Sequence, residues 1–97
     1  GGENISSAEV EAELYACESV GEAAVFGAPD ERLGEVPVAV VLPAEGTDLT
    51  QEDLRAFLDS RIAAYKIPER FIFVNESLPR LGTGKIDRVA LKAKYAA

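Results

Sequence analysis

The sequence contains no histidine and only one cysteine, and each scarcity excludes a class of chemistry. Without histidine, the chain lacks the usual general base and the commonest metal ligand, so we expect no metal site. The single cysteine, Cys17, cannot form a disulfide within the chain, which favours a reducing cytoplasm. Cys17 follows Val10 and Leu14 at helical spacing, which favours a buried structural thiol over a nucleophile.

Long hydrophobic runs are also missing. No apolar stretch approaches the roughly 20 residues of a membrane helix, and no stretch has the pattern of a signal peptide. A hydrophobic content of 47% with 28% charged residues is typical of an ordinary globular protein. The 97 residues suit one small domain with little room for an internal active site. Because the chain begins GGENI without a methionine, we interpret it as a segment of a longer protein.

Basic residues are scarce in the first two thirds of the chain. Residues 1–64 contain 3 basic and 14 acidic residues, a net charge of −11, whereas residues 65–97 contain 7 and 3, a net charge of +4. The overall charge of −7 argues against a nucleic-acid partner. The basic end predicts one local surface for an anion, and a solvated basic helix is the alternative.

Capping residues and hydrophobic periodicity predict the order α, β, β, α, β, turn, α. Helices are expected after Ser6–Ser7, after Thr50 and after Asp87. Residues 20–31 and 35–42 predict an antiparallel pair connected at 30–34, and residues 70–75 predict a further buried strand. The fold class is therefore α+β, a small mostly antiparallel sheet with helices packed against it, in one domain over residues 1–97.

The stretch GTGK, residues 82–85, is neither of two common nucleotide-binding loops. A P-loop needs glycine where Pro79 stands and serine or threonine where Ile86 stands, and the Rossmann pattern needs a third glycine where Asp87 stands. A turn remains, in which two glycines permit unusual backbone angles and the following lysine projects a mobile cation with three donors. The alternative is an exposed hairpin lysine without a function.

Three stretches resemble one family in order and spacing: GGENISSAEVE at the start, YKIP at 65–68 and LPRLGTGKID at 78–87. They resemble the C-terminal domain of the adenylate-forming acyl- and aryl-CoA synthetases, a superfamily that includes nonribosomal peptide adenylation domains and firefly luciferase. GAPDERLGEVPVAVVLP also resembles the family's G-x-P-D-x-x-x-G-E region, so the resemblance covers essentially the whole chain.

The resemblance implies a two-step reaction. A carboxylic acid and MgATP give an acyl-adenylate and pyrophosphate, and the thiol of CoA then displaces AMP to give a thioester. The family's large N-terminal domain would be the partner of this segment, which would act as a rotating lid and be inactive in isolation. No metal or cofactor is expected to bind to this segment alone, because ATP with Mg²⁺ and CoA are substrates of the intact enzyme.

The resemblance also implies roles for single residues. Lys85 matches the adenylation lysine, held by the turn Gly82, Thr83 and Gly84, and the same lysine is a candidate for inactivating acetylation, which would remove its charge. Gly1 and Gly2 match a loop that lines the pantetheine channel, with a plain turn as the alternative.

Lys66 and Arg70, on either side of Pro68, are candidates for binding the phosphates of CoA. This sequence has Ile67 and Glu69 where some relatives place further basic residues, which favours the alternative of two solvated charges.

The leading hypothesis is the C-terminal lid of an acid–CoA ligase for a fatty or related organic acid. The alternatives are part of an adenylation domain that loads a carrier protein, and a non-catalytic acidic module whose basic end binds a partner. The pocket that selects the acid and the hinge of the lid are expected outside this segment.

Overall fold

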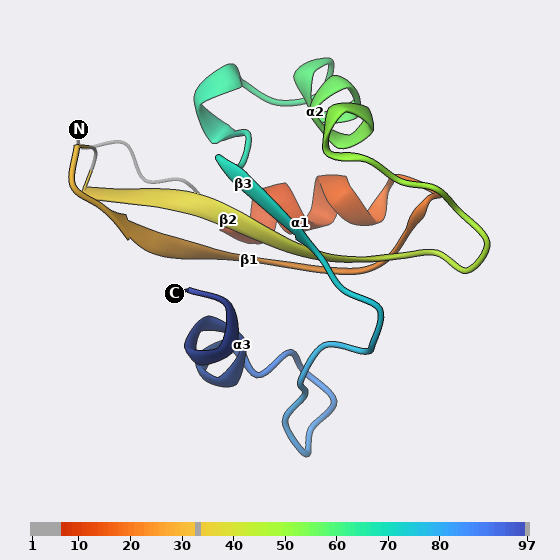
Figure 1. Cartoon of the computed structure of the whole chain (residues 1–97), viewed down its shortest axis with the longest axis vertical. Coiled ribbons are helices and arrows are strands. Elements are labelled where there is room, and N and C mark those ends of the chain that lie inside the picture. The colour runs from red at the N-terminus through yellow and green to blue at the C-terminus, as the bar shows by residue number, and fades with distance from the viewer. Residues whose placement is uncertain (1–6, 33, 97) are drawn as a thin grey trace.

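The chain forms a sheet covered by helices on both faces (Figure 1). A computed structural model describes residues 7–32 and 34–96. Within them the elements follow the predicted order, which confirms the α+β class: α1 (Ser7–Tyr15), β1 (Val20–Asp30), β2 (Gly34–Pro43), α2 (Gln51–Asp59), the 3₁₀ helix η1 (Ala64–Lys66), β3 (Arg70–Phe73) and α3 (Arg88–Tyr95). Of the helices in these two ranges, none combines the length and the apolar character that crossing a membrane requires.

The predicted helix starts agree with the hydrogen bonds at the caps. The Thr50 hydroxyl accepts a hydrogen bond from the Asp53 N–H at 3.1 Å, and the Asp53 carboxylate accepts one from the Thr50 N–H at 3.1 Å, which completes a capping box on α2. Asp87 caps α3 by accepting from the Ala90 N–H at 3.0 Å. The first helix begins at Ser7, and Ser6 lies outside the described residues.

The sheet has the strand order β1-β2-β3. β1 and β2 pair antiparallel along the whole of β1, and their register closes at Asp30 opposite Gly34, as the sequence predicted. After β2 the chain crosses over through α2 and η1, and β3 then pairs parallel with β2. The predicted buried strand at 70–75 is shorter than expected and only Phe71 is buried in it, because β3 lies at an edge of the sheet.

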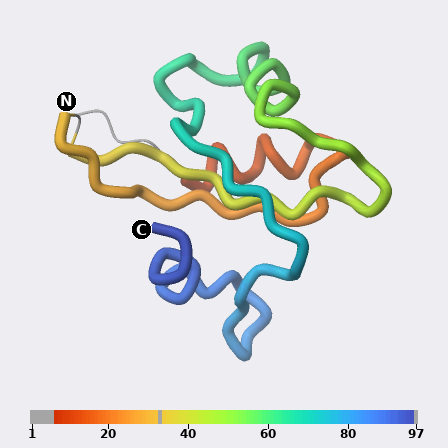
Figure 2. The backbone as a smooth tube through the Cα atoms, viewed as in Figure 1, coloured from red at the N-terminus to blue at the C-terminus, as the bar shows by residue number. Residues whose placement is uncertain are grey.

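Successive residues of β1 and β2 point to opposite faces and build two separate cores. One face packs against α1 and α2, and the other packs against α3 and the segment before it. After β3 the chain passes from the side of the sheet that carries α2 to the side that carries α3 (Figure 2). The first core includes Ala23, Val25, Ala39, Val41, Val10, Leu14, Leu54 and Leu58. The second includes Ala24, Phe26, Val38, Val40, Leu78 and Leu91. Cys17 lies beyond the end of α1, partly buried against the first core.

A β-bulge at the start of β1 changes which face its side chains reach. The register with β2 shifts between Val20 and Glu22. Val20 therefore joins the core under α1 and α2, although strict alternation would place it on the same face as Glu22 and Ala24. A Cβ at Gly21 would lie only 3.1 Å from the Leu42 carbonyl oxygen, so this close approach suits glycine. The bulge leaves Glu22 on the face that carries α3.

Ion pairs connect acidic α1 to the later, basic part of the chain. Arg88, the first residue of α3, forms an ion pair with Glu11 of α1, and Glu11 raises the pKa of the Arg88 guanidinium. Glu11 also accepts from the Val25 N–H at 2.8 Å, and Arg88 donates to the Val25 carbonyl at 3.0 Å. Because β1 is an edge strand, these two side chains satisfy backbone groups that no strand pairs with.

Candidate functional site

Lys85 lies at the end of a tight hairpin between β3 and α3. Arg80 and Ile86 form an antiparallel bridge across its base. The Leu81 N–H donates to the Lys85 carbonyl at 2.8 Å, and the Gly84 N–H donates to the Leu81 carbonyl at 2.9 Å. This is the hydrogen-bond pattern of a three-residue hairpin loop that ends in a bulge residue. The turn predicted at 82–85 is therefore present, with a defined backbone.

One of the two glycines in the turn has a conformation that glycine favours. Gly84 has φ = +91°, in the left-handed region, whereas Gly82 lies outside that region. A Cβ at either position would meet nothing within 4 Å, so the requirement at Gly84 is conformational and not steric contact with neighbours. The sequence-based expectation of backbone freedom at both glycines thus applies to Gly84 alone.

Replacing Gly84 with alanine is expected to lower the free energy of unfolding of the 97-residue chain by about 1–2 kcal/mol, the cost of holding an L-residue in the left-handed region. Gly82→Ala is the matched control, because it adds the same methyl group two residues away in open space. It should be neutral or slightly stabilising, since alanine restricts the unfolded chain. Urea denaturation of both variants measures the difference, and equal losses would contradict this account of the turn.

The Lys85 side chain is exposed, and its ammonium group has no ion pair or hydrogen bond within residues 7–32 and 34–96. Most other basic side chains of the C-terminal third have protein partners: Lys66, Arg70, Arg80, Arg88 and Lys94. In that part of the described chain, only Lys85 and Lys92 lack one. Within the C-terminal third of the described chain, the unpaired positive charge thus lies at two lysines, of which Lys85 alone lies on the hairpin.

The two residues predicted to bind CoA phosphates are not brought together. The Lys66 ammonium donates to both carboxylate oxygens of Glu9 at 2.9 and 3.1 Å, and this pairing raises the pKa of Lys66. The Arg70 guanidinium donates to the Tyr95 carbonyl of α3 at 3.4 Å. Since α1 and α3 cover opposite faces of the sheet, the two cations serve different faces. Their role in binding CoA stays a prediction.

The predicted pantetheine loop at Gly1 and Gly2 lies outside the described residues. α1 is the first described element after it, and α1 is joined to the start of α3 by the pair of Glu11 and Arg88. Arg88 follows Lys85 by three residues. The ion pair of Glu11 and Arg88 therefore connects α1, the helix after the predicted pantetheine loop, to the start of α3, just after the turn that carries Lys85.

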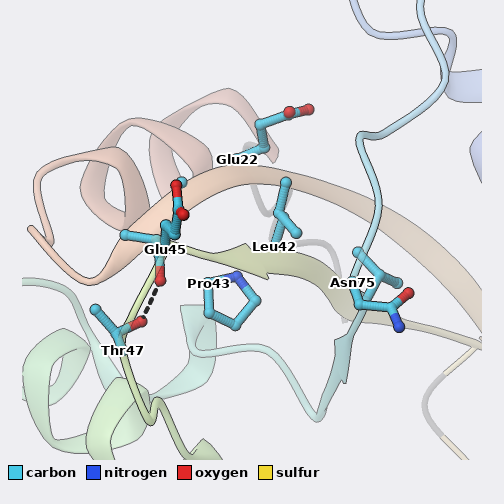
Figure 3. A pocket seen from close by; sticks show the side chains of 9 residues that line it. Glu22, Leu42, Pro43, Glu45, Thr47 and Asn75 are labelled. Atoms are coloured by element: carbon cyan, nitrogen blue, oxygen red, sulfur yellow. Dashed lines mark hydrogen bonds between the residues drawn. The ribbon is translucent and has the colours of Figure 1, made fainter.

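A groove of about 530 Å³ lies where β1 and β2 meet the segment after β3 (Figure 3). Glu22, Glu45 and Asn75 are among the polar residues that line it, and the Thr47 hydroxyl donates to the Ala44 carbonyl at 2.7 Å. Lys85 is not among its lining residues. In the described part of the chain, no three histidine, cysteine, aspartate or glutamate residues are grouped to hold a metal ion. Because Lys85 lies outside the groove, an anion bound to it would need another surface to enclose it.

Residues 9–85, which include the turn up to Lys85, match the family model described as the AMP-binding enzyme C-terminal domain. The chain belongs to this family. The membership confirms the resemblance inferred from the three sequence stretches, and it places Lys85 at the last matched position.

Relatives of this AMP-binding enzyme C-terminal domain include feruloyl-CoA synthase from Amycolatopsis sp, 45% identical over 95 residues, which are 98% of this chain. The solved structure of ATP-bound MatB from Rhodopseudomonas palustris superposes with a TM-score of 0.90 at 34% identity over 99% of this chain. A Mycobacterium tuberculosis fatty acyl CoA synthetase gives a TM-score of 0.89 at 35% identity, also over 99%. The chain spans 19% of the length of each of these three proteins.

Two residues of this AMP-binding enzyme C-terminal domain were not identified as site residues from the sequence: Arg80, which contacts the turn, and Glu22, which contacts Arg80. Arg80 donates to the Gly84 carbonyl at 2.8 Å and to the Glu22 carboxylate at 3.2 Å. Glu22 stands 58 positions before Arg80, so no local pattern indicates the pair. Gly21, the bulge glycine before Glu22, is the one nearby signal in the sequence. It does not by itself indicate the pair, because a glycine within a strand can have several structural causes.

Proposed function

We propose that this chain is the C-terminal lid domain of an acid–CoA ligase. The intact enzyme joins a fatty or related organic acid to CoA and converts ATP, which enters with Mg²⁺, to AMP and pyrophosphate. Its own N-terminal domain is the partner that holds ATP and the acid. The observation that carries the proposal is the exposed ammonium of Lys85, which has no partner among the described residues and lies on a turn of defined backbone in a member of this family.

The first step brings two anions together. A carboxylate oxygen attacks the α-phosphorus of ATP, the new O–P bond forms, and pyrophosphate leaves with the electron pair of the broken P–O bond. At a separation of about 4 Å, two unit charges repel by roughly 4 kcal/mol at an effective dielectric constant of about 20. The ammonium of Lys85 offsets this repulsion by binding oxygens of both reactants, more strongly as charge develops in the transition state. No proton moves, so the step needs no histidine.

The second step needs a different surface. The sulfur of CoA attacks the acyl carbon, the C–S bond forms, the C–O bond to AMP breaks, and the thiol proton passes to solvent. Carboxylate and phosphate no longer approach each other, so a cation between them has no function here. Rotation of the lid would remove Lys85 and bring the segment with Gly1 and Gly2 to the pantetheine arm, a domain-scale case of conformational gating.

The identity of the acid is set outside this domain. A relative named for feruloyl-CoA and a neighbour named for fatty acyl CoA both match nearly the whole chain. Lys85 contacts only the groups that all these reactions share, the carboxylate and the phosphate. This supports a role for the domain that does not depend on which acid the enzyme uses.

The full-length protein tests the proposal directly. It is incubated with ATP, Mg²⁺, CoA and single acids, either saturated fatty acids of several lengths or hydroxycinnamic acids, and pyrophosphate release and CoA thioester are measured together. We expect one class of acid to give both products in equal amounts, and removal of residues 1–97 to abolish both. Pyrophosphate release with transfer only to a phosphopantetheine carrier protein, or no acid-dependent release at all, would overturn it.

A further inference from the structure

We infer that Arg80, anchored by Glu22, is a positioning residue that fixes the direction in which the hairpin presents Lys85. The inference rests on the proposed function of Lys85 in adenylate formation. It assigns to this pair a part in that step which acts through the backbone of the turn, without contact to the reactants. Four features of the structure support it.

The first feature is that both peptide groups beside the Lys85 Cα are held. The Gly84 carbonyl, which belongs to the peptide group before Lys85, accepts from the Arg80 guanidinium at 2.8 Å. The Lys85 carbonyl, in the peptide group after it, accepts from the Leu81 N–H at 2.8 Å. With both neighbouring peptide planes fixed, the Cα–Cβ bond of Lys85 has one direction, while its long side chain keeps its rotational freedom.

The second feature is that the same guanidinium ties the turn to the sheet. A second nitrogen of Arg80 donates to Glu22 Oε1 at 3.2 Å, and the Leu78 N–H donates to that oxygen at 3.1 Å. Leu78 is buried in the core beneath α3, so the segment entering the hairpin is anchored beside the pair. The turn is therefore held relative to β1 as well as within itself.

The third feature is the bulge that directs Glu22 to this place. Without the register shift after Val20, the side chains on either side of Gly21 could not both reach their present faces. The Glu22 side chain is only 19% exposed, although it is a carboxylate at the end of an edge strand. Its burial is compensated by the charge of Arg80 and by the Leu78 N–H.

The fourth feature is what would remain without the guanidinium. The hairpin would keep its backbone hydrogen bonds, including that of the Asp87 N–H to the Pro79 carbonyl at 2.9 Å, so it would still form. The Gly84 carbonyl would lose its partner, and the tip could tilt against the sheet. A displacement of about 1 Å at a reacting group can cost on the order of 100-fold in rate, so a small tilt is sufficient to matter.

The test compares Arg80→Ala with Arg61→Ala in the full-length enzyme. Arg61 is a close match, because its side chain is 43% exposed against 42% for Arg80, and it pairs with Glu13 of α1 at 2.6 Å on the other face of the sheet. We expect Arg80→Ala to lower kcat for ATP–pyrophosphate exchange by about 10- to 100-fold with little change in KM for ATP. Thioester formation from supplied acyl-adenylate should remain normal, and Arg61→Ala should leave both half-reactions unchanged.

Three further variants make the result specific. In a Lys85→Ala background, Arg80→Ala should cause no further loss of exchange activity, because the two residues act through one group. Arg80→Lys should recover only part of the rate, since a single ammonium cannot reproduce the planar fork that reaches two acceptors. Glu22→Gln, which keeps an acceptor for Leu78, tests the same contact if Arg80→Ala proves unstable in thermal unfolding.

The outcomes separate this inference from the proposed function. If Lys85→Ala leaves adenylate formation intact, the proposed function of the lysine fails, and the inference fails with it. If Lys85→Ala is impaired while Arg80→Ala and Glu22→Gln behave like Arg61→Ala, the inference alone is overturned. Equal losses in both half-reactions, or a full additional loss in the double variant, would also overturn it by showing a structural role.

Discussion

Replacing Lys85 with alanine in the full-length enzyme is expected to lower the rate of adenylate formation by about 100- to 1,000-fold, the typical effect of removing one group that stabilises developing charge. Thioester formation from supplied acyl-adenylate should stay near its normal rate. The reason is that the ammonium offsets the repulsion between carboxylate and α-phosphate, which exists only in the first step. ATP–pyrophosphate exchange measures the first step, and conversion of purified acyl-adenylate with CoA measures the second.

Lys92→Ala is the matched control for this experiment. Lys92 is an exposed lysine of α3 that, like Lys85, has no partner among the described residues, so its removal changes the net charge of the domain equally. It should leave both half-reactions unchanged. Lys85→Arg keeps the charge but spreads it over a planar group, and partial activity is expected. Equal losses in the two half-reactions for Lys85→Ala, or the same loss for Lys92→Ala, would contradict the assignment of the lysine.

The second large effect is expected at Leu91. Leu91→Ala should lower the free energy of unfolding of the 97-residue chain by about 2–5 kcal/mol, the usual range for truncating a fully buried leucine. Leu91 is 0% exposed and is the one buried residue of α3, all of whose positions the structure describes. Its side chain packs from α3 against the sheet face that includes Phe26 and Val38. Its loss leaves α3 with few apolar contacts to the rest of the chain.

Val89→Ala provides the control, because Val89 lies two residues earlier in the same helix and is 83% exposed. Its free energy of unfolding should change by less than about 0.5 kcal/mol. Urea denaturation measures both variants, and amide hydrogen exchange locates the effect. Exchange in Leu91→Ala should accelerate first in α3 and in the hairpin before it, while the face under α1 and α2 stays protected. Uniform acceleration would show that the two cores unfold together.

Local features were readable from the sequence because each depends on residues a few positions apart. Thr50 and Asp53 form a capping box across three residues, and Asp87 caps α3 with a single hydrogen bond from the Ala90 N–H, three residues on. The connection at 30–34 and the turn around Gly84 follow from the conformational preferences of proline, aspartate and glycine. Lys85 could be identified as a candidate because it directly follows that turn and because the surrounding stretch resembles a known family.

Other features depend on residues that only the folded chain brings together. β3 pairs parallel with β2 because the chain crosses over through α2 and η1 before it reaches β3. The four residues of β3 do not indicate by themselves which strand they will pair with. The charge count showed a basic C-terminal third, but it could not show that most of these cations are paired within the protein. Lys66 and Arg70, four residues apart, act on opposite faces because one pairs with α1 and the other with α3.

The sequence by itself determined the elements, their order, the family and the lysine that the turn presents, because those depend on short-range preferences and on recognisable motifs. The tertiary structure decided which cations are free and how the turn is held. Glu22 and Arg80 are 58 positions apart, and a hydrogen bond of 3.2 Å between them exists only when a bulge in β1 and the hairpin after β3 lie on the same face of the sheet. Hydrogen bonds and ion pairs act over a few ångströms, so contacts between distant segments follow from the packing of the whole fold.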